Sequence, residues 1–173
     1  DDRLSPQDAN EIAEACVKMA EVKTGALIVI ERNVSMGDIV SASGVAVDAV
    51  ISSQLLINIF EDKTPLHDGA VIIRDNRVAA ASCILPGTQS EIGKELGTRH
   101  RAAVGASEVS DAFIIVVSEE TGKISIAVDG NLNYNLSLDD ARMILVEELK
   151  PKKEVLLDDE FVDEKEDDND ENA

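Results

Sequence analysis

Two short segments contain the side chains with the clearest potential for chemistry. Residues 66–73 read LHDGAVII and residues 97–103 read GTRHRAA, and together they hold both histidines of the chain. The first segment places a histidine beside a carboxylate, and the second places a histidine between two arginines. In a chain with a formal net charge of −19, a packed cationic triplet needs an explanation. A bound polyphosphate supplies one, because arginine presents several donors to phosphate oxygens.

The cationic segment is expected at the start of a helix over residues 99–107. Thr98 is expected to cap this helix with its side chain, while the first backbone N–H groups and the positive end of the helix dipole point outward. Arg99, His100 and Arg101 add donors suited to phosphate oxygens. The alternative is that the two arginines pair with surface carboxylates, and the spacing alone does not separate these two interpretations.

The carboxylate segment also permits two interpretations. Asp68 and Gly69 precede an expected strand, so they are typical of a tight turn in which glycine adopts a positive φ. Alternatively, Asp68 binds a divalent cation, and Gly69 and Ala70 allow a ligand close to the backbone. The turn is the simpler interpretation. Glu119 and Glu120 are likewise either a solvated hairpin tip or side chains that reach the same site as Asp68.

Composition limits the classes of protein to consider. The 173 residues include three Phe, one Tyr and no Trp, so an aliphatic core of helices packed on β-branched strands is expected. An acidic chain without a basic stripe is a poor ligand for polymeric nucleic acid. Cys16 and Cys83 lie in apolar surroundings without zinc spacing, which predicts buried thiols in a reducing compartment.

The negative charge is concentrated at one end. Residues 154–173 hold 11 of the 35 acidic residues and a single basic residue, Lys165. We expect residues 1–153 to form one domain and residues 154–173 to be a disordered acidic tail, because the tail has too little apolar surface to fold. An electrostatic contact with a partner is the alternative role for this tail.

The apolar periodicity predicts an α/β fold with a central twisted, mixed parallel and antiparallel β-sheet flanked by helices. Adjacent strand pairs exclude a purely parallel, doubly wound sheet. A loop that contains Asn33, Gly37 and Gly44 is expected before Asp48. The expected elements are a helix over 5–23 capped by Ser5, a strand over 26–30, a helix over 49–60 capped by Asp48, strands over 69–74 and 77–85, a helix over 99–107, strands over 112–117 and 123–128, and a helix over 137–150.

Taken together, the DGA triplet at 68–70 and the TRHR run at 98–101 resemble the paired signatures of diadenylate cyclase domains. The resemblance extends through NIF at 58–60, TPLH at 64–67, KELG at 94–97 and SEETG at 118–122. Within that family the chain looks most like the membrane-anchored type of Gram-positive bacteria. The resemblance therefore implies a soluble catalytic fragment that lacks the N-terminal transmembrane helices, from a protein held at the cytoplasmic face of the bacterial plasma membrane.

The activity implied by the resemblance is condensation of two ATP molecules into cyclic di-AMP with release of two pyrophosphates. A divalent metal is the implied cofactor, with Mg²⁺ or Mn²⁺ as the main candidates and Co²⁺ as a third. Because the product has two identical halves, a face-to-face homodimer is expected to be the active species. The resemblance also implies regulation by a YbbR-type protein and by phosphoglucosamine mutase.

The resemblance assigns roles to individual positions. The implied catalytic residues are Asp68, Arg99 and His100. The implied metal ligands are Asp68, Glu120 and, as a further candidate, His67. The implied ATP-binding residues are Gly69, Ala70, Leu85, Thr98, Arg99, His100, Arg101, Ser118, Glu119 and Glu120. The chain departs from the family at Ile84, where relatives of this type often have a tyrosine that stacks on adenine.

Two other functions are compatible with the same residues. One is a non-catalytic sensor of a nucleotide or cyclic dinucleotide, and the other is a scaffolding domain with merely polar loops. The presence of Asp68 beside the complete TRHR run favours the enzyme, because a sensor has less need of a metal-binding carboxylate.

Overall fold

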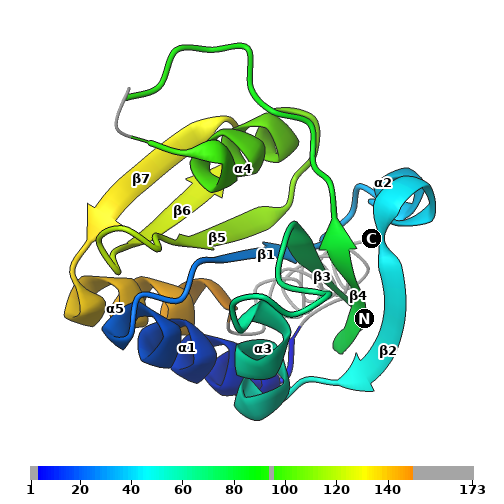
Figure 1. Cartoon of the computed structure of the whole chain (residues 1–173), viewed down its shortest axis with the longest axis horizontal. Coiled ribbons are helices and arrows are strands. Elements are labelled where there is room, and N and C mark those ends of the chain that lie inside the picture. Colours follow the sequence, from blue (N-terminus) through cyan, green and yellow to red (C-terminus); the bar gives the residue numbers. More distant parts are fainter. Residues whose placement is uncertain (1–3, 94–95, 150–173) are drawn as a thin grey trace, which may run out of the picture.

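A mixed seven-stranded sheet organises the chain (Figure 1). The computed structural model describes residues 4–93 and 96–149, so the expected acidic tail, residues 154–173, lies outside the described residues. The elements are α1 (Pro6–Glu21), β1 (Ala26–Ile30), α2 (Gly37–Ser43), β2 (Val45–Val50), α3 (Ser53–Phe60), β3 (Ala70–Arg74), β4 (Arg77–Cys83), α4 (Thr98–Glu108), β5 (Phe113–Val117), β6 (Ile124–Val128), β7 (Asn131–Leu136) and α5 (Leu138–Leu149).

The strands lie in the order β2-β4-β3-β1-β5-β6-β7. Only β1 and β3 pair in parallel, and the other neighbours are antiparallel. The expected mixed α/β sheet is thus confirmed. Among the described helices, none is both long and apolar enough to cross a bilayer.

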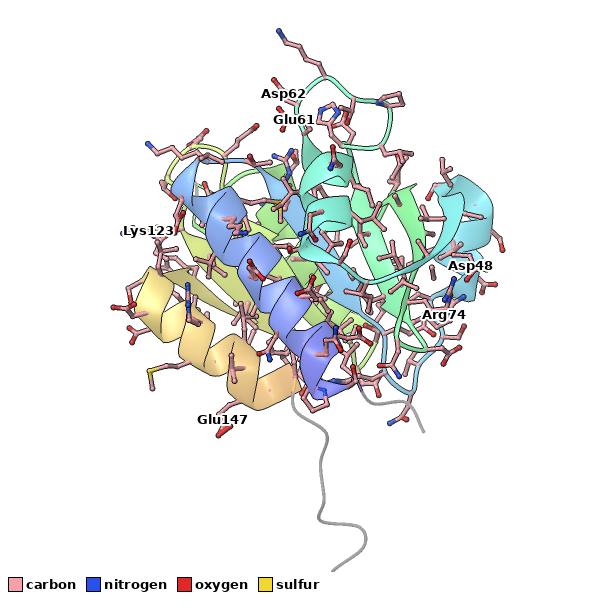
Figure 2. The ribbon with its side chains drawn as sticks, turned by 90° about the horizontal axis from the view of Figure 1, so that it is seen from below. Asp48, Glu61, Asp62, Arg74, Lys123 and Glu147 are labelled. Carbon is pink, nitrogen blue, oxygen red and sulfur yellow. The ribbon has the colours of Figure 1, made fainter. Side chains whose placement is uncertain are left out.

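Helices cover both faces of the sheet because its central strands are apolar on both sides. All five residues of β1 are buried, and successive side chains point to opposite faces. Ile28 and Ile30 join the core shared with α1, α3 and α5, whereas Leu27 and Val29 join the core shared with α4. Figures 1 and 2 show α1 and α5 side by side across one face, with α4 on the other.

The first helix forms as the sequence predicts. The Ser5 hydroxyl accepts a hydrogen bond from the Asp8 backbone N–H at 3.1 Å, which satisfies a donor that the first helical turn leaves without an intrahelical partner. The apolar stripe of Ile12, Cys16 and Met19 is buried. The position of α1 on the sheet is therefore determined by a local cap and a regular apolar stripe.

The expected start of the third helix is wrong. Residues 45–50 form β2 and pair with β4, and Asp48 has a φ of 50° within that strand. The helix begins later, where the Ser52 hydroxyl accepts a hydrogen bond from the Leu55 N–H at 3.1 Å. Asp48 instead pairs with Arg77, with 2.6 Å between Oδ1 and Nε. Pairing with a distant strand outweighed the local capping signal.

Two further elements, α2 and β7, lie where the sequence indicated no regular structure. Most residues of β7 are exposed, and none is buried. Like β2, it lies at an edge of the sheet and pairs with a single neighbour, so it lacks the apolar pattern that marks central strands. Helix α2 has no buried residue, and its sequence consequently shows no apolar stripe.

Candidate active site

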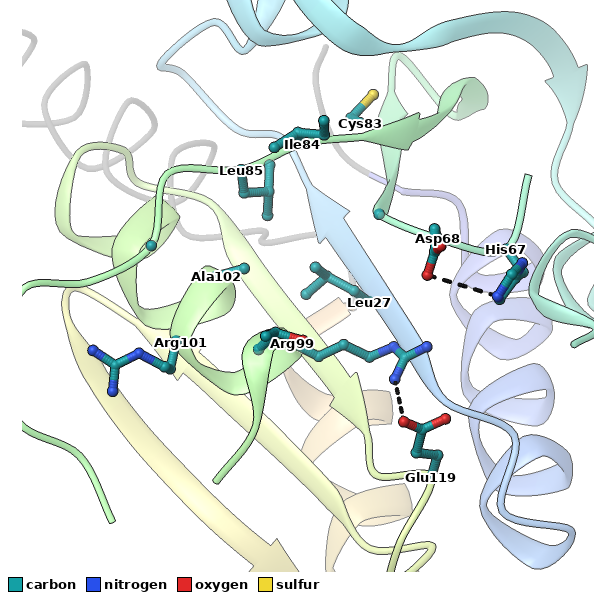
Figure 3. Close-up of a pocket in the computed structure, with 13 residues that line it drawn as sticks. Leu27, His67, Asp68, Cys83, Ile84, Leu85, Arg99, Arg101, Ala102 and Glu119 are labelled. Carbon is teal, nitrogen blue, oxygen red and sulfur yellow. Dashed lines mark ion pairs between the residues drawn. The ribbon is translucent and has the colours of Figure 1, made fainter. Parts of the chain in front are cut away.

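A cavity of about 650 Å³ lies between the end of β4, the start of α4 and the turn before β3 (Figure 3). Its apolar wall includes Leu27, Leu85 and Ala102, and its charged side chains come from the two segments that the sequence singled out and from the turn after β5. The lining residues are Leu27, His67, Asp68, Gly69, Cys83, Ile84, Leu85, Gly87, Thr98, Arg99, Arg101, Ala102 and Glu119. An apolar wall facing a few charged groups suits a ligand such as a nucleotide, which has an apolar and a charged end.

Arg99 contributes the central cation of this cavity. Its side chain leaves the first turn of α4 and extends past the beginning of β1 toward Glu119 (Figure 3). The Arg99 Nη1 and Glu119 Oε1 atoms are 3.4 Å apart, and the two side chains are 20% and 65% exposed. Arg99 is thus compatible with both interpretations of the cationic segment, because it pairs with a carboxylate and also lines a cavity that a phosphate could enter.

The opposite wall carries His67 and Asp68. The His67 ring contacts the Thr64 carbonyl oxygen through Nδ1 at 2.7 Å, and since a carbonyl only accepts, Nδ1 carries a proton. Nε2 is turned toward two carboxylates, 3.6 Å from Oδ1 of Asp68 and 3.8 Å from Oδ1 of Asp62. The Asp68 side chain is 87% exposed, so its carboxylate is accessible to a ligand.

Gly69 explains how this wall is built. Its φ is +91°, and a Cβ at this position would lie 2.8 Å from the Cys83 carbonyl oxygen and 2.9 Å from the Ser82 carbonyl carbon. Only glycine allows this conformation and this approach to the end of β4. The turn interpretation is therefore confirmed for Gly69, and the turn holds Asp68 at the edge of the cavity.

Arg101 lines the cavity but points away from Asp68 and Arg99 (Figure 3). Its Nη2 donates to the Thr88 carbonyl oxygen at 3.2 Å, and the Thr88 N–H donates to the Arg101 carbonyl oxygen. The expectation that Thr98 caps α4 is wrong. Gly97 is the cap residue and makes no side-chain bond, so Thr98 is the first residue of the helix and reaches the cavity from there.

Four expected site residues do not line the cavity. Ala70 is buried within β3. His100 is buried behind Arg99. Burial lowers the pKa of its imidazole, and the positive charge of Arg99 lowers it further, although Glu120 acts in the opposite direction.

The other two residues, Ser118 and Glu120, lie in the turn after β5. Ser118 accepts hydrogen bonds from the N–H groups of Glu120 and Thr121 at 3.2 Å. This turn presents Glu119, rather than Glu120, to the cavity.

Several lining residues were not assigned to a site from the sequence: Leu27, Cys83, Gly87 and Ala102. Leu27 and Ala102 carry no local signal, because they look like any core residue of a strand or helix. Cys83 is buried, as expected of an apolar thiol, and this burial raises its pKa. Ile84, where the sequence departs from the family pattern, is 73% exposed at the cavity.

The side chains that could act as metal ligands show how far the cavity fits the expected divalent metal. Among residues 4–93 and 96–149, no three His, Cys, Asp or Glu side chains are grouped closely enough to hold a metal ion. Asp68 and His67 nevertheless provide a carboxylate and an imidazole at one edge of the cavity. The Asp68 carboxylate fits Mg²⁺, which is usually bound by one or two carboxylates together with substrate phosphates and water, whereas the His67 imidazole suits a transition-metal ion better.

Comparison with known proteins gives consistent matches. The family model described as DisA bacterial checkpoint controller nucleotide-binding matches residues 13–132. The cyclic di-AMP synthase CdaA of Bacillus subtilis is 51% identical over 140 residues, which cover 80% of this chain and 51% of that protein. A diadenylate cyclase of Listeria monocytogenes is 52% identical over 132 residues, or 76% of this chain and 48% of that protein. The chain thus spans about half the length of these curated relatives.

Solved structures agree with the sequence matches. The crystal structure of a double mutant of DacA from Staphylococcus aureus superimposes with a TM-score of 0.77 at 46% sequence identity. The match covers 82% of this chain and 94% of that one. A membrane-spanning protein from Bacillus cereus, described as hypothetical, matches with a TM-score of 0.68 at 45% identity, over 74% of this chain and 63% of that one.

Proposed function

The chain belongs to the DisA-type nucleotide-binding family of diadenylate cyclase domains, and on this premise we propose that it condenses two ATP molecules into cyclic di-AMP and two pyrophosphates. Each 3′-hydroxyl oxygen forms a bond to the α-phosphorus of the other ATP. The bond from that phosphorus to the pyrophosphate breaks, and the hydroxyl proton leaves. The observation that carries this proposal is one cavity with Asp68 on one wall and Arg99 on the other.

The proposed division of labour follows from the charges. Arg99 and the first backbone N–H groups of α4, beside Thr98, neutralise the triphosphate, because phosphoryl transfer depends mainly on positioning and charge stabilisation. The adenosine lies toward Leu27, Ile84 and Leu85, the apolar side of the cavity. Arg101 serves this site less directly than Arg99, since its guanidinium is bonded to Thr88.

Asp68 and His67 are the residues that we propose to hold the divalent ion. When bound, such an ion supplies positive charge that offsets the negative charge of the phosphates. Glu120 is a weaker candidate ligand than its position in the sequence suggested, because Glu119 takes its place in the cavity lining. Asp68 is also our candidate to accept the proton of the 3′-hydroxyl, since its exposed carboxylate lies within the cavity.

A two-fold homodimer completes the proposed mechanism. One cavity holds one ATP, whereas the product joins two nucleotides in symmetric bonds, so two cavities must face one another during the reaction. An obligate monomer that retained the full rate would contradict this mechanism. The membrane location, the YbbR-type regulator and phosphoglucosamine mutase stay predictions from the family resemblance.

The direct test is to incubate the chain with ATP and Mg²⁺, Mn²⁺ or Co²⁺ and to measure cyclic di-AMP by chromatography and mass spectrometry. Asp68→Asn is expected to lose turnover by roughly 100-fold or more while still binding ATP. The matched control is Asp129→Asn, an exposed position with a φ of 51° that asparagine tolerates well. Full activity of Asp68→Asn, or no product with any metal from a folded dimer, would contradict the proposal.

A further inference from the structure

Gly25, the residue before β1, lies against the guanidinium of Arg99. Gly25 is buried, and a Cβ placed on it would lie 2.6 Å from both Cζ and Nη1 of Arg99 and 2.9 Å from Nη2. Carbon atoms in ordinary contact are about 3.5–4.0 Å apart. The arginine head therefore fills the space that any side chain at position 25 would need.

We propose that Gly25 is a positioning residue for Arg99, because its missing side chain forms the seat that holds the guanidinium in the cavity. This inference rests on the proposed function, since it takes Arg99 as a ligand of the ATP triphosphate. It assigns a binding role to a residue outside both sequence signatures. Gly25 acts through Arg99 and does not itself contact the substrate.

The seat is needed because the other contact of Arg99 is weak. Bidentate binding of phosphate requires the guanidinium plane to have a defined orientation. Glu119 is the sole ion-pair partner of Arg99 among the described residues, it is 65% exposed, and the 3.4 Å separation is long for a strong charged hydrogen bond. One long contact to an exposed carboxylate does not fix the orientation of the guanidinium plane, whereas close packing against backbone does.

The backbone itself does not require glycine at position 25. The described glycines with positive φ are Gly69, Gly122 and Gly130, so Gly25 has a backbone conformation that alanine can adopt. The atoms that its Cβ would meet belong to the tip of a flexible side chain. At Gly105, by contrast, a Cβ would overlap the carbonyl oxygen of Pro86, which is backbone. Alanine at position 25 should thus displace the guanidinium by about 1 Å and leave the fold intact.

The test measures ligand binding separately from catalysis. Calorimetric titration of the wild-type chain and of Gly25→Ala with α,β-methylene-ATP and Mg²⁺ is expected to show about tenfold weaker binding to the variant. A displacement of this size is expected to lower kcat/KM for ATP by roughly 10- to 100-fold. The melting temperature should change by no more than about 4 °C. Gly37→Ala, at the start of α2 and away from the cavity lining, is the control that should change neither binding nor kcat/KM.

A double-mutant cycle identifies Arg99 as the mediator. In an Arg99→Ala background there is no guanidinium to displace, so Gly25→Ala should cause no further loss of affinity. The proposal is overturned by wild-type affinity in Gly25→Ala, by additive losses in the double variant, or by an unfolded Gly25→Ala, which would mean that the backbone needs glycine.

Failure of this inference is distinguishable from failure of the proposed function. A wild-type chain that binds the analogue but makes no cyclic di-AMP contradicts the proposed function, and the Gly25 comparison then still tests the seat. If the wild-type chain makes cyclic di-AMP and Gly25→Ala binds the analogue equally tightly, only the positioning role of Gly25 is contradicted. A wild-type chain that does not bind the analogue overturns both.

Discussion

Replacing Gly69 with alanine should destabilise the protein strongly, in contrast to the mild effect expected at Gly25. Gly69 has a φ of +91°, and its missing Cβ would lie 2.8 Å from the Cys83 carbonyl oxygen, 2.9 Å from the Ser82 carbonyl carbon and 3.1 Å from the Cys83 nitrogen. All three atoms are backbone, and they belong to the β3–β4 pair. Moving them would disturb the end of this strand pair, where Ala70 lies opposite Cys83.

The magnitude has two parts. A left-handed conformation costs a residue with a side chain about 1–2 kcal/mol, and overpacking in a well-packed region costs about 1–3 kcal/mol more. The sum is about 2–5 kcal/mol. This is a large share of the free energy of unfolding of a typical domain, which is about 5–15 kcal/mol. Because Gly69 follows Asp68 directly, the variant should also lose ATP turnover under conditions in which it remains folded.

Urea unfolding followed by circular dichroism measures this effect. With a slope of about 2 kcal/mol per molar urea, the midpoint of Gly69→Ala should fall by roughly 1–2.5 M. Gly87→Ala is the matched stability control, because a Cβ there meets no atom within 4 Å and the φ is not positive. It should be as stable as the wild type or up to about 1 kcal/mol more stable. Equal midpoints for the two variants would refute the reasoning.

Three other substitutions test the electrostatics. The lowered pKa of His100 means that the folded state binds fewer protons than the unfolded state, so stability present above pH 6.5 is lost as the pH falls through the folded-state pKa. His100→Gln should reduce the stability difference between pH 7.5 and pH 5.0 in urea titrations, and an unchanged difference would contradict this. The Glu31 side chain is only 8% exposed and accepts three hydrogen bonds from Arg74 at 2.9–3.1 Å, so Glu31→Gln should cost about 1–3 kcal/mol. Glu14→Gln, which breaks an exposed pair with Lys18, should have no measurable effect on the urea midpoint. If Glu14→Gln and Glu31→Gln lowered the midpoint equally, burial would not be the reason that the Glu31–Arg74 pair stabilises the protein.

The elements that the sequence predicted correctly carry their signals locally. Strands β1 and β5 are continuous apolar runs because both of their faces are covered. Helices α1 and α5 begin at serines whose hydroxyls accept from a backbone N–H three residues later. The predicted start of α3 is wrong because Asp48 is a residue type that commonly caps helices, whereas the actual cap is Ser52. Pairing of β2 with β4 decided between them.

The candidate site shows the same division between local and distant information. The sequence by itself determined the family and the two segments that form the walls of the cavity, because these depend on residue types at fixed spacing. It did not determine which residues of the TRHR run face the cavity. Successive residues of a helix point about 100° apart, so the packing of α4 places Arg99 in the cavity, buries His100 and directs Arg101 toward Thr88.

Only the tertiary structure brings Gly25, Arg99 and Glu119 together, from the beginning of β1, the beginning of α4 and the turn after β5. No spacing within the chain encodes this contact, because it depends on β1 and β5 being neighbours in the sheet and on α4 crossing them. A sequence specifies such a site through the long-range packing of apolar faces. That packing is settled by the total area buried rather than by any short motif.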